Sequence, residues 1–242
     1  MPLVYSRPTK VTKSKPLVVI KYNPHHDHLG RFTSGGGGGA LSSFERKVDE
    51  AYGTGEEAFS IAHTGDVSTA ALGTYLAKGH VLNDSLRDGP DAAKNDWMTD
   101  TRTAEDVAVG LDHAIEVAPR MPNETVWRVA SAEAISSLKK GATYQDSGFT
   151  STTAADITQP EHGILLLSLA HVSDGQKTIM QINTGKEGKG LYMPKMFPGQ
   201  PIAEHEKEFL LPRNTQMKYL GVDYKFIGDS RPLEIHKFKV VN

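Results

Sequence analysis

The 242-residue sequence contains no cysteine, few aromatic residues and no long apolar run. Without cysteine there can be no disulfide and no thiolate metal site, which fits a reducing compartment such as the cytoplasm. No segment approaches the roughly 18–20 apolar residues that span a bilayer, and residues 17–20 are too short for a signal peptide. A formal net charge of −2 argues against a dedicated nucleic-acid binder. These absences predict a soluble protein without membrane or nucleic-acid partners.

Residues 1–39 differ in composition from the rest of the chain. Every charged side chain before Asp27 is basic, and residues 35–39 are an uninterrupted run of glycine. The run also fits the pattern G-x-G-x-x-A of dinucleotide-binding loops, but no strand directly precedes it, so a flexible linker is favoured. We therefore predict a flexible basic arm over residues 1–39 and one large domain over residues 40–242.

A histidine-rich stretch lies within this arm. His25, His26, Asp27 and His28 are residue types that bind metal ions. Adjacent positions in a chain rarely converge on one ion, so we predict no metal site here. The surrounding residues 23–35 resemble segments of tailed-phage head-associated proteins.

Residues 40–120 have the features of helices, and residues 121–242 those of strands. The patterns Ser42-x-x-Glu45 and Thr103-x-x-Asp106 are capping boxes that predict helix starts. An apolar stripe over residues 67–87 predicts one or two helices between them. After Pro122, a helix is predicted over residues 131–139 and strands over residues 125–129, 148–153, 164–169, 178–182, 191–193, 208–211, 217–222 and 233–241. Helices followed by strands predict an α+β fold, with a helical lobe packed on a β-rich core.

Three alternating glutamates precede the apolar run at residues 209–211. If the segment is extended, Glu204, Glu206 and Glu208 lie on one face, with the last two at the lip of a cleft. Neighbouring carboxylates raise each other's pKa, a cost usually tolerated where cations or chemistry use them. An edge strand with a solvated acidic face fits the same pattern, so both interpretations stay open.

Three motifs occur in a characteristic order: Val-Trp-Arg at residues 126–128, Gly-Phe-Thr-Ser-Thr-Thr at 148–153 and Glu-Lys-Glu-Phe-Leu-Leu-Pro at 206–212. This order resembles the arginine–serine–glutamate class of mono-ADP-ribosyltransferases, which includes binary-toxin components and phage-encoded enzymes. Tyr75 and residues 81–87 resemble the helical lobe that precedes the arginine strand in toxin-like members. Thr153 departs from the family's serine but keeps a hydroxyl. The resemblance implies an ADP-ribosyltransferase-like fold with a mixed or antiparallel two-sheet β core.

The resemblance also implies an activity: transfer of ADP-ribose from NAD to arginine side chains of host proteins, with release of nicotinamide and without a metal. In this scheme Glu208 stabilises the oxocarbenium-like ribose. Glu206 takes a proton from the acceptor guanidinium, whose pKa lies above about 12. Arg128 clamps the NAD phosphates and Ser151 orients the catalytic carboxylate. The cofactor-binding residues implied are Arg128, Phe149, Ser151, Thr152 and Glu208.

Other residues have secondary roles in this scheme. The loop at residues 194–205, with Met196 and Phe197, would present the protein acceptor, and Asn83 and Arg87 would shape the helical lobe. Two alternatives stay open: a virion or interaction protein with the same fold but no turnover, and an NAD glycohydrolase in which water replaces the acceptor. The expected place of action is the host-cell cytoplasm, whether the protein is made there or delivered with a virion.

Overall fold

The computed structural model describes residues 42–53, 66–89, 103–157, 177–226 and 232–241. The predicted arm at residues 1–39 and the predicted strand at residues 164–169 lie outside these ranges. Within the described ranges, none of the helices combines the length and the apolar character that a bilayer crossing requires.

Three helices form the first half of the described chain: α1 (Ser43–Tyr52), α3 (Asp66–Asp88) and α4 (Ala104–Val117). The capping boxes predicted at Ser42 and Thr103 begin α1 and α4, with hydrogen bonds in both directions. Helix α3 is kinked at Lys78, whose φ of −143° and ψ of 30° are not helical. A Cβ atom on the next residue, Gly79, would lie 2.8 Å from Cε2 of Tyr75, so only glycine leaves room for that ring.

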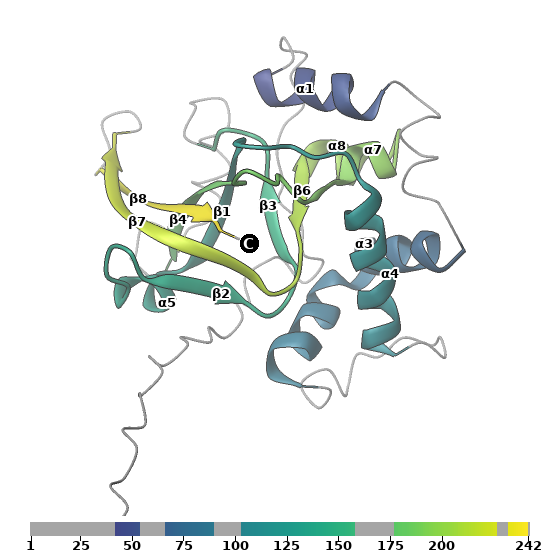
Figure 1. Cartoon of the computed structure of the whole chain (residues 1–242), viewed down its shortest axis with the longest axis horizontal. Helices are drawn as coiled ribbons and strands as arrows, with labels where there is room; N and C mark the ends of the chain where they lie inside the picture. Colours follow the sequence, from purple (N-terminus) through teal and green to yellow (C-terminus); the bar gives the residue numbers. More distant parts are fainter. Residues whose placement is uncertain (1–41, 54–65, 90–102, 158–176, 227–231, 242) are drawn as a thin grey trace, which may run out of the picture.

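Eight strands form one mixed sheet in the order β2-β7-β8-β4-β1-β3-β6-β5 (Figure 1). Of the described pairs, β4 and β8 run parallel and the others run antiparallel. The strands are β1 (Thr125–Ser131), β2 (Thr143–Asp146), β3 (Thr150–Thr153), β4 (Lys177–Asn183), β5 (Leu191–Tyr192), β6 (Glu208–Leu211), β7 (Thr215–Lys225) and β8 (Leu233–Val240). Three short helices connect them: α5 (Ala132–Ser136), α7 (Met193–Met196) and α8 (Pro201–Glu206).

The sheet has a narrow join between β1 and β3. Strand β1 pairs with β4 along its whole length, but its pairing with β3 is one position, Trp127 opposite Thr153. The join separates a five-stranded part from a three-stranded part, whereas the resemblance implied a core of two sheets. Hydrogen bonds at the join make them one sheet.

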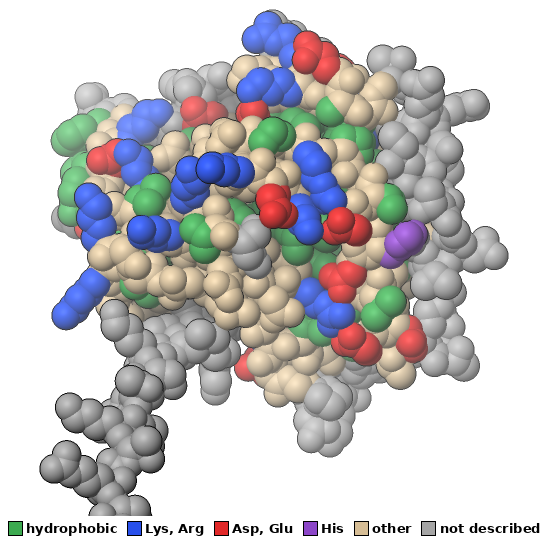
Figure 2. Space-filling view, in the orientation of Figure 1, with side chains coloured by type: hydrophobic (Ala, Val, Ile, Leu, Met, Phe, Trp, Pro, Cys, Tyr) green, Lys and Arg blue, Asp and Glu red, His purple; other side chains and the backbone are tan. Residues whose placement is uncertain are grey.

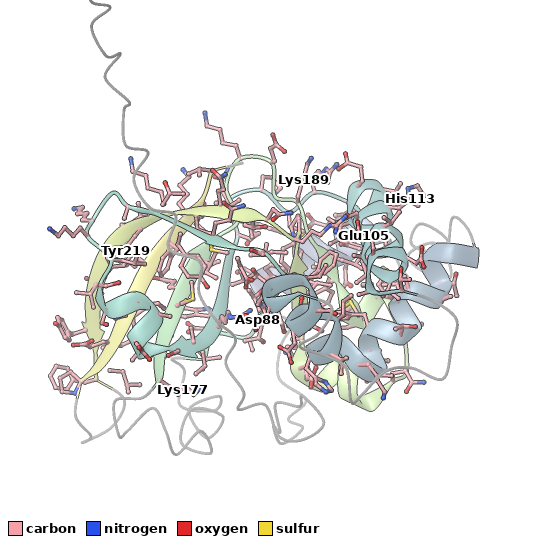
Figure 3. The ribbon with its side chains drawn as sticks, turned by 90° about the horizontal axis from the view of Figure 1, so that it is seen from below. Asp88, Glu105, His113, Lys177, Lys189 and Tyr219 are labelled. Carbon is pink, nitrogen blue, oxygen red and sulfur yellow. The ribbon has the colours of Figure 1, made fainter. Side chains whose placement is uncertain are left out.

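The helices pack on one face of this sheet. Along β1, Val126 belongs to the main core with residues of α1, α3 and α4, whereas Trp127 belongs to a smaller cluster with Ile157, Ile179 and Ile235. Because side chains alternate along a strand, Arg128 shares the helical face with Val126. In Figure 3, Glu105 of α4 and Tyr219 of β7 lie toward opposite ends of the molecule.

Charged side chains add a link between the two halves. In the view of Figure 2, acidic side chains gather over α3 and α4, and basic ones predominate over the strands. Arg213, in the turn before β7, donates two bonds of 2.9 Å to Glu105 and one of 2.8 Å to Asp112. This fork connects α4 to the sheet, although exposed pairs of this kind each contribute only about 0–1 kcal/mol.

Candidate active site

The sheet order brings the three sequence motifs together. Arg128 lies on β1, Ser151 on β3 and Glu208 at the start of β6, and these three strands are neighbours. In the β3–β6 pair, Thr153 lies opposite Glu208 and Ser151 opposite Leu210, so Ser151 and Glu208 are on adjacent strands near one end. Residues far apart in sequence therefore share one site on the helical face.

Glu208 is buried, with 7% of its surface exposed. Its Oε1 atom accepts a hydrogen bond of 2.8 Å from the Tyr75 hydroxyl, and the Ser151 hydroxyl bonds to the same carboxylate. Burial raises the pKa of Glu208, while the bonds from Ser151 and Tyr75 and the charge of Arg128 act to lower it. The carboxylate is thus enclosed but surrounded by groups that favour its charged form.

Tyr75 is a site residue that the sequence did not reveal as one. It occupies a position in the apolar stripe of α3, and nothing local indicates that its hydroxyl reaches a carboxylate 133 positions away. Burial raises the pKa of Tyr75 well above its usual range, and the charges of Glu208 and Glu206 raise it further. Tyr75 therefore stays protonated and acts as a hydrogen-bond donor.

The nitrogens of the Arg128 guanidinium differ in their hydrogen-bond partners. Its Nη1 atom donates to the Ser151 carbonyl at 3.2 Å and lies 3.9 Å from Oδ2 of Asp146. Its Nε atom is buried and has no hydrogen-bond partner among the described residues. A buried guanidinium nitrogen without a partner is costly, so the geometry favours an anionic ligand at this nitrogen of Arg128.

A buried ion pair supports the segment that leads into β3. Arg87 donates from Nε and Nη2 to the two oxygens of Asp146 at 2.7 and 2.9 Å, and each side chain is 4% exposed. Burial acts to raise the pKa of Asp146, but Arg87, Arg128 and the backbone N–H of Gly148 together lower it below its usual value. One turn earlier on α3, Asn83 accepts a bond of 2.8 Å from the backbone N–H of Phe149. Asn83 and Arg87 thus fix the turn between β2 and β3.

The glutamate motif differs from the predicted extended strand. Helix α8 continues through Glu206, Lys207 is left-handed with φ 45° and ψ 40°, and the strand begins only at Glu208. The prediction of one glutamate face was therefore wrong: Glu204 is exposed, and its Oε1 accepts a bond from Gly199 at 3.0 Å. Proline at the first helical position favours this helix start. Glu206 nevertheless lies close enough to Tyr75 for its charge to raise the pKa of that hydroxyl.

The end of β3 holds this turn. The Thr153 hydroxyl donates to the Glu206 carbonyl at 2.9 Å and accepts from the N–H of Ala155 at 3.1 Å. The N–H of Ala154 donates to the Lys207 carbonyl at 2.9 Å. The threonine that replaces the family's serine thus keeps the hydroxyl that fixes the glutamate turn.

Three further predicted residues are buried. Phe149 is fully buried, its ring centroid 6.5 Å from that of Tyr75, and the Thr152 hydroxyl donates to the Phe209 carbonyl. Their contact with NAD stays a prediction. Met196 is also fully buried, and residues 194–205 hold α7 and α8 instead of a simple loop. The role of this segment in presenting an acceptor stays a prediction.

Comparisons with known proteins identify the family. The family model described as ADP-ribosyltransferase exoenzyme matches residues 50–239. The chain belongs to this family. No curated protein matches the sequence. Among the residues that the structure describes, no three histidine, aspartate or glutamate side chains come together as metal ligands.

Solved toxin structures share the fold of this ADP-ribosyltransferase. Plx2a of Paenibacillus larvae is 16% identical, with a TM-score of 0.54 over 82% of this chain and 94% of that chain. Vis of Vibrio splendidus is 15% identical, with a TM-score of 0.51 and 82% of each chain covered. BECa of C. perfringens, solved with NADH, is 16% identical, with a TM-score of 0.56 over 82% of this chain. The match spans 48% of BECa, about half its length. The predicted ADP-ribosyltransferase-like α+β fold is confirmed.

Proposed function

We propose that this chain transfers ADP-ribose from NAD to arginine side chains of proteins and releases nicotinamide. Membership in the ADP-ribosyltransferase exoenzyme family supports ADP-ribose transfer in general. The observation that carries the proposal is the pair of carboxylates at one turn, with Glu208 enclosed by Tyr75 and Ser151 and Glu206 two residues earlier.

The NAD pyrophosphate suits the guanidinium of Arg128. A pyrophosphate offers several acceptor oxygens, and the planar guanidinium can bind two of them at once. The buried Nε of Arg128, which lacks a partner among the described residues, would gain one. Two structural relatives were solved with such a ligand, BECa with NADH and C3stau2 of S. aureus with NAD.

The first chemical step breaks the bond between ribose and nicotinamide. Nicotinamide leaves with the bonding electron pair, and positive charge develops on the ribose carbon. The carboxylate of Glu208 is fixed by two hydroxyl donors, so it faces this charge without having to reorganise. Removing one preorganised group of this kind typically costs about 10²–10³-fold in rate.

The second step joins the ribose carbon to an arginine nitrogen. The guanidinium must lose a proton as the new carbon–nitrogen bond forms, and Glu206 can accept it. Glu206 is half-buried, whereas Glu208 is buried. An acceptor side chain entering from outside would meet Glu206 first, while Glu208 stays with the ribose.

Labelled NAD tests the acceptor. We expect label on arginine residues when the protein is incubated with NAD and a bacterial lysate, because we propose host proteins in the cytoplasm as targets. Peptide mapping identifies the labelled side chain. Label found only on cysteine, asparagine or nucleic acid would contradict arginine transfer.

Two variants separate the roles of the carboxylates. Glu208→Gln should lose both NAD cleavage and transfer, because the charge facing the ribose is gone. Glu206→Gln should lose transfer and keep a substantial part of NAD hydrolysis. Equal loss of both activities in both variants would contradict the division of roles. A wild-type protein that hydrolyses NAD but labels no protein would be a glycohydrolase, and one inactive in both assays would be an interaction protein.

A further inference from the structure

Helix α1 contacts both residues that flank Glu208. Oε1 of Glu45 lies 2.7 Å from Nζ of Lys207, and the ring of Phe44 meets that of Phe209 edge-on with centroids 5.6 Å apart. The side chain of Glu208, between these two residues, accepts a hydrogen bond from Tyr75. Figure 1 shows α1 above α8 at the end of the molecule where β6 begins.

Lys207 has a backbone conformation that lysine rarely adopts. Its φ of 45° lies in the left-handed region, where glycine or asparagine is the usual residue after a helix. Glycine or asparagine at this position would therefore adopt the left-handed backbone conformation at a lower energetic cost than lysine. Unlike those residues, lysine has a side chain long enough to bring an ammonium group to Glu45. We therefore ask what the ion pair contributes to the site.

Glu45 is well placed to hold that ammonium. Its Oε2 atom accepts the N–H of Ser42 at 2.8 Å in the capping box, so the side chain is fixed before Oε1 meets Lys207. Burial acts to raise the pKa of Glu45, but the hydrogen bonds from Lys207 and Ser42 outweigh it, so the pKa lies below its usual value. Glu45 is therefore ionised at neutral pH, and the pair is charged.

The rest of α1 holds the segment that precedes the turn. The Tyr52 hydroxyl accepts the N–H of Tyr192 at 3.2 Å, and Lys195 pairs with Asp49 at 2.7 Å. Helix α1 is thus fixed to β5 and α7 independently of the Glu45–Lys207 bond, so it can serve as a rigid support for the glutamate turn.

We propose that the Glu45–Lys207 pair is a positioning device for transfer to arginine, a role that rests on the function proposed above. Glu208 is held by Tyr75, by Ser151 and by the β3–β6 ladder. Glu206 instead ends a six-residue helix directly before the left-handed Lys207, and it is tied to β3 by the bond from the Thr153 hydroxyl to its backbone carbonyl, outside the strand ladder. Loosening Lys207 should therefore displace Glu206 more than Glu208, and transfer should suffer more than NAD hydrolysis.

The ratio of transfer to hydrolysis tests this role. Lys207→Asn keeps a residue that tolerates the left-handed conformation and removes the ammonium. With an arginine peptide as acceptor, we expect its kcat for transfer to fall about tenfold, its NAD hydrolysis to stay near wild type and its melting temperature not to fall. Glu45→Gln should change the ratio in the same way, the double variant should add little, and Lys207→Arg should restore the ratio.

Lys47→Met is the matched control. It removes another ion pair of α1, with Glu124, that does not involve the glutamate turn. An unchanged ratio in Lys207→Asn, or an equal fall in Lys47→Met, would overturn the positioning role while the proposed function stands. A wild-type protein without NAD cleavage or transfer would overturn both proposals.

Discussion

Changing Tyr75 to Phe removes the hydroxyl that bonds to the buried carboxylate and little else. The donor and acceptor are 2.8 Å apart and both residues are buried. A hydrogen bond to a charged group contributes about 1.5–3 kcal/mol, and 1.4 kcal/mol corresponds to a factor of ten in rate. NAD cleavage should therefore fall about ten- to a hundredfold. The phenyl ring can keep its edge contact with Phe149, so the fold should persist.

The same variant should change the pH dependence of NAD cleavage. The Tyr75 bond favours the charged form of Glu208, whose pKa is already raised by burial. Without that bond the pKa of Glu208 rises further. Because the ionised carboxylate is needed at the ribose, activity is lost as pH falls through this pKa. The acid limb of the profile should therefore move to higher pH.

The measurement is kcat/KM for NAD cleavage across neutral and acidic pH. Tyr219→Phe is a suitable control, because Tyr219 is also buried and its hydroxyl lies 2.9 Å from Nδ1 of His236. Tyr219 lies toward the opposite end of the molecule from Glu105 of α4 (Figure 3). Equal rates and the same acid limb in Tyr75→Phe and wild type would refute the assignment of Tyr75 as a positioning donor.

Three further variants address the supports of the site. Gly79→Ala would place a Cβ 2.8 Å from the Tyr75 ring, so NAD cleavage should fall as in Tyr75→Phe, although alanine favours helix by about 1 kcal/mol; unchanged cleavage would contradict this. The raised pKa of Glu208 means that this group contributes stability at acidic pH, which is lost as pH rises through that pKa. Glu208→Gln should thus melt higher at neutral pH, and a lower melting temperature there would contradict the reasoning. Arg87→Met leaves Asp146 buried without its partner, at a cost of about 3–5 kcal/mol in chemical denaturation; a cost below about 1 kcal/mol would mean that the buried pair contributes little.

Local patterns predicted the helices well because the interactions that begin them are local. The capping boxes at Ser42 and Thr103 involve residues three positions apart, and both are present in the structure. The predicted strands that lie in the described part of the chain are present too, but β2 (Thr143–Asp146) was missed. Its four residues are too few for a clear alternation.

Two features of the site could not be predicted from the sequence. One depends on a contact between residues far apart in the chain, and the other on a spacing of residues that fits both a strand and a helix. Glutamates at alternate positions can occur in a strand or in a helix. In the structure a helix begins at Pro201 and ends at Glu206, and the left-handed Lys207 separates it from β6. The hydroxyl of Tyr75 reaches Glu208 across 133 positions, and no local pattern encodes such a contact. The order of the motifs indicated the site, but the residues that support it emerged only from packing.

Three polar residues of α3, Tyr75, Asn83 and Arg87, connect the two parts of the sheet. The pairing of β1 with β3 is a single position, so the sheet alone fixes the relation between its two parts weakly. Tyr75 bonds to Glu208 on one part, and Arg87 bonds to Asp146, which lies on the other part at the end of β2. Asn83 holds the turn that leads into β3. The kinked helix thus bridges the join and contacts both the Glu208 carboxylate and the segment beside the arginine strand.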